Sequence, residues 1–167
     1  MNKDTIKILC LSDSHRQFST IYNIALGEKP NIILHAGDSE GAFEKLEAAL
    51  SEKIPGVECH AVLGNCDWFS NNYPHQKLIN VRCKRFFIMH GHQYPALRRN
   101  NDYTETVSLA KKHGADVLIF GHTHTQMSQN MDGILVVNPG AAKIGAYAVI
   151  EVGADGAIEV HLLRERL

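Results

Sequence analysis

The stretch Phe120-Gly121-His122-Thr123-His124-Thr125 places two histidines directly after an apolar run. That run, residues 117–120, is short and rich in β-branched and aromatic side chains, which is typical of a buried strand. We expect Gly121 to let the backbone turn, so that both imidazoles emerge where the strand ends. A single His-x-His pair is weak evidence of a site, because a surface loop can carry two histidines without a function. The rest of the chain therefore has to show whether these two histidines belong to a functional site.

Composition and charge are those of an ordinary globular protein. A length of 167 residues suits one well-buried domain, which we expect to span residues 1–167. The net charge of -1 offers no electrostatic argument for nucleic acid or an anionic membrane as partner. The four cysteines form no C-x-x-C pair, so we expect reduced, mostly buried thiols. With no apolar run near the roughly 18 residues of a membrane span, we expect a cytoplasmic protein, and a homo-oligomer stays open.

Strands and helices alternate along the first part of the chain. We expect strands over residues 6–11, 31–35, 59–63, 77–82, 85–89 and 117–120. We expect helices over residues 20–26 and 104–113, and a third that begins at a Ser39 cap and carries Phe43, Leu46 and Leu50 on one face. Residues 98–102 are expected to be a polar connection. This order indicates a layered α/β fold with mixed sheets.

The last part of the chain changes character. Short runs at residues 125–130, 134–137, 146–152 and 157–163 resemble strands. The dipeptides Asp132-Gly133 and Asp155-Gly156 lie between them, and Asp-Gly is a strong hairpin signal. We therefore expect mostly antiparallel strands here, arranged as a meander.

Five times along the chain, an apolar strand is followed at once by residues of metal-ligand type. They are Asp13 with His15, Asp38, Asn65, His90, and His122 with His124. Strand ends on one edge of a sheet converge, and open α/β sheets place their ligand crevice there. Seven donors are about twice what one tetrahedral zinc ion needs. The count favours two metal ions that share a carboxylate, and Asp38 is the natural bridge because it stands alone between the two groups.

Taken together, these motifs resemble those of the calcineurin-like metallophosphoesterases. The matching segments are Asp13-Ser14-His15, Gly37-Asp38, Gly64-Asn65-Cys66-Asp67, His90-Gly91-His92, Gly121-His122-Thr123-His124 and Asn138-Pro139-Gly140. The small size and the Gly-Asn-Cys-Asp segment are similar to the compact bacterial and archaeal phosphodiesterase branch, to which the retromer subunit Vps29 is related. The resemblance implies a layered β-sandwich of two mixed sheets flanked by helices, with a dimetal site at the C-terminal ends of the strands.

The resemblance also implies a ligand set and a reaction. Asp13, His15 and His124 would hold one ion, Asn65, His90 and His122 the other, and Asp38 both. We expect a metal-dependent phosphodiesterase that acts on a small-molecule phosphodiester through a bridging hydroxide nucleophile. The donor set suits Mn, Fe, Zn or Ni, and the family makes Mn²⁺ the expected metal.

Asn65, Cys66 and His92 are the candidate catalytic residues. Many larger relatives carry a histidine where this chain has Cys66, and a thiol is a poorer proton donor at pH 7 than an imidazolium. We therefore expect slower turnover and a bias toward good leaving groups, unless Cys66 only fills space near the metals. His92 is expected to face the substrate phosphate.

Other polar and aromatic residues near these motifs have structural interpretations. His35 lies in a strand and is expected to be a hydrogen-bonded core residue. Asp67 either orients a neighbouring group or caps the turn. Arg98 and Arg99 are expected to be solvated, although either could bind a phosphate. Trp68-Phe69 and Tyr73 could form an apolar rim for a base or aryl group, but we expect a buried or subunit-contact cluster.

A non-catalytic docking module like Vps29 is the alternative function. Such a module can lose metal donors, whereas all seven positions here keep metal-competent residue types. Ligand completeness therefore favours an enzyme. Amide hydrolysis at a His-x-His site is disfavoured, because the barrels that carry it are longer than this chain.

Overall fold

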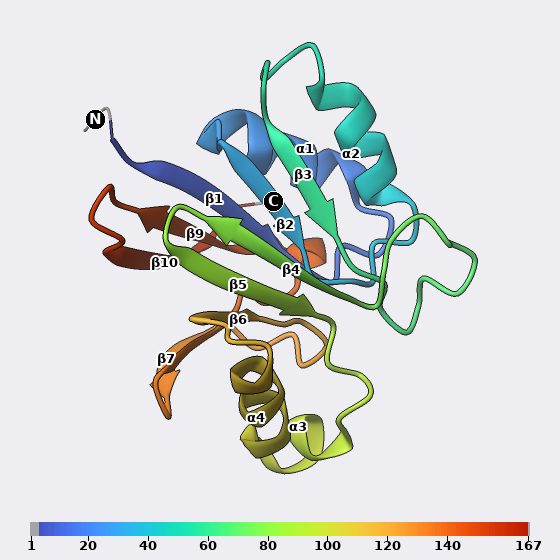
Figure 1. The fold of residues 1–167 in the computed structure, drawn as a ribbon. Helices are drawn as coiled ribbons and strands as arrows, with labels where there is room; N and C mark the ends of the chain where they lie inside the picture. Colours follow the sequence, from blue (N-terminus) through green and yellow to red (C-terminus); the bar gives the residue numbers. More distant parts are fainter. Residues whose placement is uncertain (1–3, 167) are drawn as a thin grey trace.

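Two five-stranded sheets lie face to face, and helices cover the outer face of each (Figure 1). The computed structural model describes residues 4–166. Its strands are β1 (Ile6–Leu11), β2 (Ile32–His35), β3 (Glu58–Ala61), β4 (Gln76–Val81), β5 (Lys84–Met89), β6 (Val117–Ile119), β7 (Met127–Met131), β8 (Ile134–Asn138), β9 (Ala146–Val152) and β10 (Ile158–Arg164). The helices are α1 (Phe18–Glu28), α2 (Ala42–Leu50), α3 (Pro95–Asn100), α4 (Thr104–Lys112) and the 3₁₀ turn η1 (Ala142–Ile144). The layered sandwich of two mixed sheets flanked by helices is confirmed.

The first sheet has the strand order β10-β9-β1-β2-β3. Strands β1, β2 and β3 are parallel, and α1 and α2 provide the crossovers between them. Their carboxyl ends therefore lie at one edge, where Leu11 pairs with His35 and His35 with Ala61. The loops that carry Asp13 and Asp38 begin at this edge.

The second sheet has the order β4-β5-β6-β8-β7. Its three central strands are parallel, with Phe87 paired with Leu118 and Leu118 with Val136. The antiparallel strands β4 and β7 form its two edges. Residues that follow β5 and β6, including His90 and His122, consequently leave this sheet side by side.

Alternating side chains fill separate layers of the core. On β1, Ile8 packs between the two sheets and Leu9 packs under α1 and α2. On β5, Ile88 faces the first sheet and Phe87 packs against α3 and α4. All four are at most 2% exposed, which fixes the register of both strands because a slip by one residue would turn each side chain to the wrong layer. Within residues 4–166, no helix combines the length and apolar character that crossing a membrane requires.

Helix boundaries depart from expectation in three places. Helix α1 is longer than residues 20–26 at both ends. Helix α2 begins after Gly41, whose φ of 85° turns the chain, and Ser39 contributes only its backbone carbonyl to the amide of Ala42. The expected Ser39 cap was therefore wrong. The polar connection expected at residues 98–102 was wrong for 98–100, which belong to α3, and right for 101 and 102; Pro95 starts this helix, and proline suits the first helical turn.

The C-terminal part forms two hairpins and not one meander. Asp132-Gly133 joins β7 to β8 and Asp155-Gly156 joins β9 to β10, as their hairpin signals predict. The two hairpins belong to different sheets, however, and η1 carries the chain from one to the other. Strand pattern alone could not distinguish these arrangements, because both bury one face of each strand.

Candidate metal centre

The seven predicted donors form one continuous cluster at the edge where the two sheets meet. Asp13 Oδ1 lies 3.0 Å from His124 Nε2, and the rings of His124 and His15 are 5.8 Å apart. His15 Nε2 is 4.0 Å from Asp38 Oδ2, which in turn lies 3.3 Å from His90 Nε2. Asn65 Oδ1 and the ring of His122 complete the cluster, at 3.2 Å from His90 Nε2 and 5.2 Å from the His90 ring. Asp38 therefore lies between His15 and His90, where a shared carboxylate is expected.

Backbone strain is concentrated in this cluster. Five of the seven donors have a positive φ; they are Asp13, His15, Asp38, His122 and His124, with φ between 42° and 64°. Non-glycine residues seldom adopt this left-handed conformation, and an arrangement that costs free energy persists where surrounding contacts impose it. The observed strain is therefore itself a sign of a functional site.

Two histidines are oriented by hydrogen bonds on the ring nitrogen that faces away from the cluster. His90 Nδ1 donates to the carbonyl of Ala36 at 2.7 Å, and His15 Nδ1 lies 2.8 Å from Glu40 Oε1. Each contact places a proton on Nδ1, so Nε2, on the side of Asp38, is the nitrogen left to bind a metal. Sequence reasoning did not single out Glu40, because nothing in its spacing marks it as a partner of His15.

Gly121 serves this site through its small size. The left-handed turn lies at His122 and His124 instead, so the expected role of Gly121 as the turning residue was wrong. A Cβ on Gly121 would lie 1.8 Å from Ser12 Oγ, whose hydroxyl donates to Asp13 Oδ2 at 2.6 Å. The glycine lets the His122 loop lie directly against the Asp13 loop.

The donors are chemically suited to cations. Burial would raise the pKa of Asp38, but its contact with His90 and the amide of Cys66 lower it below the ordinary value. Burial likewise opposes ionisation of Asp13, but its contacts with His124, His90 and Ser12 lower its pKa. Both carboxylates are therefore ionised at neutral pH, as metal ligands must be. The buried Nε2 of His15 has no hydrogen-bond partner among residues 4–166, so a metal ion would fill an unmet requirement there.

Family comparison agrees with this geometry. The family model described as calcineurin-like phosphoesterase superfamily domain matches residues 6–154. The chain belongs to the calcineurin-like phosphoesterase superfamily. A relative described as probable metallophosphoesterase YsnB from Bacillus subtilis (strain 168) is 28% identical over 161 residues, covering 91% of this chain and 88% of its own.

Solved structures of similar proteins extend over almost the whole chain. The structure of Vacuolar Protein Sorting 29 from Cryptosporidium parvum has a TM-score of 0.73 at 19% identity and covers 98% of this chain and 99% of its own. A structure described as a novel archaeal phosphodiesterase has a TM-score of 0.67 at 22% identity and covers 95% of this chain and 100% of its own. These similarities concern the fold, and the resemblance to this superfamily inferred from the motifs is confirmed.

Cys66 lies at the edge of the cluster of seven metal donors. Its amide donates to Asp38 Oδ1 at 2.7 Å, and Asn65 Nδ2 lies 3.3 Å from its sulfur. Burial and the negative charge of Asp38 raise the pKa of the Cys66 thiol to about 11, so the thiol stays protonated in the metal-free chain. Of the four cysteines only Cys10 is buried, so the expectation of mostly buried thiols was wrong.

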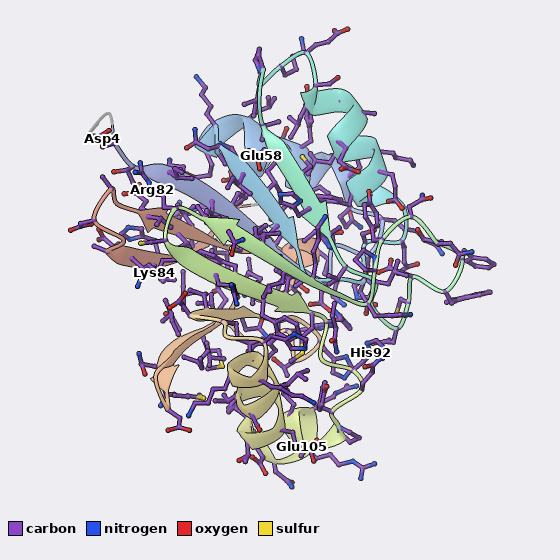
Figure 2. All side chains as sticks on the ribbon, viewed as in Figure 1. Asp4, Glu58, Arg82, Lys84, His92 and Glu105 are labelled. Carbon is purple, nitrogen blue, oxygen red and sulfur yellow. The ribbon has the colours of Figure 1, made fainter. Side chains whose placement is uncertain are left out.

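Two cationic side chains share a hollow of about 200 Å³ with the metal donors. They are Arg98 from α3 and Lys143 from η1. Arg98 is exposed, as expected, but it lies in a helix and not in a loop, and it also lines this hollow. Lys143 was missed, since no motif surrounds it. His92 lies on the segment that leads from β5 to α3 (Figure 2), and its ring is 5.5 Å from that of His90.

Asp67 and His35 stabilise the loops of the site. The Asp67 carboxylate accepts from the amides of Asp38, Glu40 and Gly64, so it both caps its own turn and orients a neighbour. His35 is fully buried and its Nε2 lies 2.9 Å from Ser14 Oγ, as a core role predicts.

Trp68 and Phe69 are exposed, at 73% and 79% of their surface. Of the two expected alternatives, a buried cluster was therefore wrong, and a subunit contact stays a prediction. They follow Asp67 in the loop between β3 and β4, which projects beyond the sheets (Figure 1).

Proposed function

We propose that the chain is a metal-dependent phosphodiesterase with two divalent cations, most suitably Mn²⁺. The proposal is carried by the convergence of seven donors from five strand ends, with Asp38 between the two groups. Asp13, His15 and His124 would hold one ion, Asn65, His90 and His122 the other, and Asp38 both. Imidazole, carboxylate and amide donors suit Mn, Fe, Ni or Zn.

The surrounding residues have distinct tasks in this proposal. When bound, the cations supply an activated water and neutralise charge that develops on the phosphoryl oxygens. Arg98 and Lys143 bind the phosphate from the open side of the cluster, since guanidinium and ammonium groups donate to phosphate oxygens. His92, whose ring is 5.5 Å from that of His90, would donate a hydrogen bond to the same group. Glu40 and Ala36 keep two imidazoles oriented throughout turnover.

A diester is favoured over a monoester as substrate. A second cavity adjoins the donor cluster at Cys66, and it offers room for an ester group that a monoester lacks. The structure described as an archaeal phosphodiesterase supports the same choice. The Vps29 structure makes protein docking the alternative, but the complete donor set supports the enzyme.

Hydrolysis of bis(p-nitrophenyl) phosphate tests the proposal. The protein is stripped with EDTA, reloaded with Mn²⁺, Fe²⁺, Ni²⁺ or Zn²⁺, and compared on this diester and on p-nitrophenyl phosphate. We expect metal-dependent cleavage that favours the diester and disappears when Asp38→Asn and His122→Ala are combined. His161→Gln, on the exposed strand β10, is the matched control. Undiminished cleavage by the double variant would exclude the proposed centre.

The docking alternative has its own decisive result. A metal-loaded protein that cleaves no monoester, aryl diester, cyclic nucleotide or single-stranded nucleic acid would support docking. The four free cysteines support a cytoplasmic location, where thiols stay reduced.

A further inference from the structure

A cavity of about 310 Å³ lies next to the metal centre, in the size range of small-molecule sites. Cys66 lines both this cavity and the hollow that holds the metal donors. A phosphodiester bound at the metals could therefore extend one ester substituent past Cys66 into the cavity. Most of the residues that line the cavity, Trp68 and Phe69 among them, belong to the loop between β3 and β4. This loop projects beyond the sheets (Figure 1).

The loop between β3 and β4 exposes two aromatic rings to solvent. The ring centroids of Trp68 and Phe69 lie 3.3 Å apart, and both residues line the cavity. Exposing two large aromatic side chains side by side is unfavourable, and such patches mark binding sites. A flat ring is the complement of an exposed indole, since stacking on an aromatic side chain contributes to nucleobase binding regardless of base identity.

Glu44 also lines the cavity, and one oxygen of its carboxylate lacks a donor. Glu44 Oε1 accepts a hydrogen bond from Ser70 Oγ at 3.2 Å. Glu44 Oε2 is buried, yet it has no hydrogen-bond partner among residues 4–166. A buried carboxylate oxygen without a partner costs free energy, which a ligand N–H would recover.

Charge in the cavity selects the kind of ring. Three carboxylates line it, from Glu40, Glu44 and Asp67, against one cation, Arg16. Arg16 Nε is already paired with Glu40 Oε2 at 2.8 Å. The net negative lining disfavours a second phosphate or an acidic peptide, and it favours a neutral ring with N–H donors.

On the basis of the proposed phosphodiesterase function, we infer that this cavity binds the nucleobase of a nucleotide diester, stacked on Trp68, with the amino group of the base donating to the Glu44 carboxylate. The substrate class is then a nucleotide phosphodiester whose base carries an exocyclic amine. Carboxylates accept from such amines in nucleic-acid recognition as well. Cys66 marks the boundary between the phosphate and the nucleoside.

Fluorescence tests the subsite without catalysis. Trp68 is the single tryptophan of the chain, so its emission reports directly on stacking. EDTA-treated protein is titrated with adenosine, with purine riboside, which lacks the 6-amino group, and with ribose. We expect saturable quenching by adenosine, about tenfold weaker binding of purine riboside, and no effect of ribose. Absence of saturable quenching by adenosine would overturn the inference, and so would equal binding of the two nucleosides.

Variants separate the two contacts. Calorimetric titration with adenosine is expected to show about tenfold weaker binding for Trp68→Ala, and similar weakening for Glu44→Gln. Leu162→Ala removes an exposed apolar side chain from β10 and is the control, expected to bind adenosine as the wild type does. If Trp68→Ala instead converts a dimer to a monomer in sedimentation, the patch is a subunit contact and the inference fails.

Kinetics connect the subsite to the reaction. The p-nitrophenyl ester of adenosine 5′-monophosphate is compared with methyl p-nitrophenyl phosphate, which has the same leaving group and no base. We expect kcat/KM to be higher for the nucleotide ester and this preference to fall about tenfold in Trp68→Ala. Equal kcat/KM for the two esters in the wild type would overturn the inference. If the metal-loaded wild type cleaves no diester at all, the phosphodiesterase proposal alone is refuted. The nucleobase subsite would still be tested, because quenching by adenosine measures it independently of catalysis.

Discussion

The carboxylate of Asp67 accepts a hydrogen bond from the backbone amide of Asp38 at 2.7 Å. The same carboxylate accepts from the amides of Gly64 and Glu40, at 2.8 and 2.7 Å. One side chain thus ties the loop after β3 to the loop after β2. It also holds Asp38 at its positive φ of 57°, in the position proposed to bridge two metals.

Asp67→Asn should therefore weaken both the fold and the metal centre. An asparagine side chain has a single carbonyl oxygen, so at least one of the three amides would face its NH₂ group and remain unpaired. We expect a loss of about 1–3 kcal/mol in the free energy of unfolding, measured with urea in EDTA, and weaker Mn²⁺ binding in calorimetry. Asp155→Asn is the control, since Asp155 accepts from the amide of Ala157 in an exposed turn where water can substitute. Equal effects of the two substitutions would contradict this role.

Metal stoichiometry distinguishes a dinuclear centre from a mononuclear one. Metal-reloaded wild-type protein should retain two ions per chain, whereas His124→Gln should retain one, because it removes a donor from one proposed site only. Elemental analysis after dialysis gives the count. The exposed group of Glu151, Glu159 and His161 also brings ligand atoms together. His161→Gln should still hold two ions; a loss there would place the second metal on the surface.

The two adjacent arginines of α3 provide a matched pair for phosphate binding. Arg98 lines the hollow that contains the metal donors, and Arg99 does not. Arg98→Ala should raise KM for bis(p-nitrophenyl) phosphate about tenfold, the magnitude expected for one hydrogen bond to a charged group. Arg99→Ala should leave KM unchanged. A similar rise in both variants would mean that general positive charge, and not a specific contact, attracts the substrate.

The donors were predictable because their signal is local. Each follows an apolar run at once, and parallel strands bring such positions to one edge, so Asp13 could be grouped with Asp38, and His90 with His122, from sequence alone. The two-sheet arrangement came from the family resemblance. Strand periodicity does not reveal which sheet a strand joins, as the division of β8 and β9 between the two sheets illustrates.

Residues that act across loops escaped sequence analysis. Glu40 and Lys143 approach the donors only after the chain folds, and neither lies in a recognisable pattern. Trp68 was expected in a buried or subunit-contact cluster, yet its side chain is 73% exposed, on a loop that projects away from the core. Tertiary placement, and not residue type, decided each of these cases.

Cys66 provides a test of proton donation to the leaving group. Its raised pKa, about 11 in the metal-free chain, makes the thiol a weak acid at neutral pH. Cys66→His should raise the rate on alkyl diesters, which have poor leaving groups, by about tenfold or more, and should change cleavage of p-nitrophenyl esters little. Cys66→Ser is the size-matched control and should behave as the wild type does. An unchanged rate on alkyl diesters in Cys66→His would assign the residue a space-filling role.

His35 makes the stability of the fold depend on pH. Burial lowers its pKa from 6.5 to about 4, although the negative charges of Asp67, Asp13 and Asp38 oppose the shift. Between these pH values the unfolded chain binds a proton at this residue and the folded chain does not. The contribution of neutral His35 to the free energy of unfolding is therefore fully present above pH 6.5. It is lost as the pH falls toward 4, by up to about 1.4 kcal/mol per pH unit.

Comparison of wild type with His35→Gln isolates this effect. The glutamine can keep a hydrogen bond to Ser14 but cannot bind a proton, so the variant should lose less stability than the wild type between pH 6.5 and 4.5. Urea unfolding in EDTA at several pH values measures the two slopes. The pKa of His90 is raised, despite its burial, by its contact with Asp38, so its own contribution is lost as pH rises above 6.5, outside this window. Parallel profiles for the two proteins would show that His35 titrates alike in the folded and unfolded chains, and the acid sensitivity would then belong to other groups.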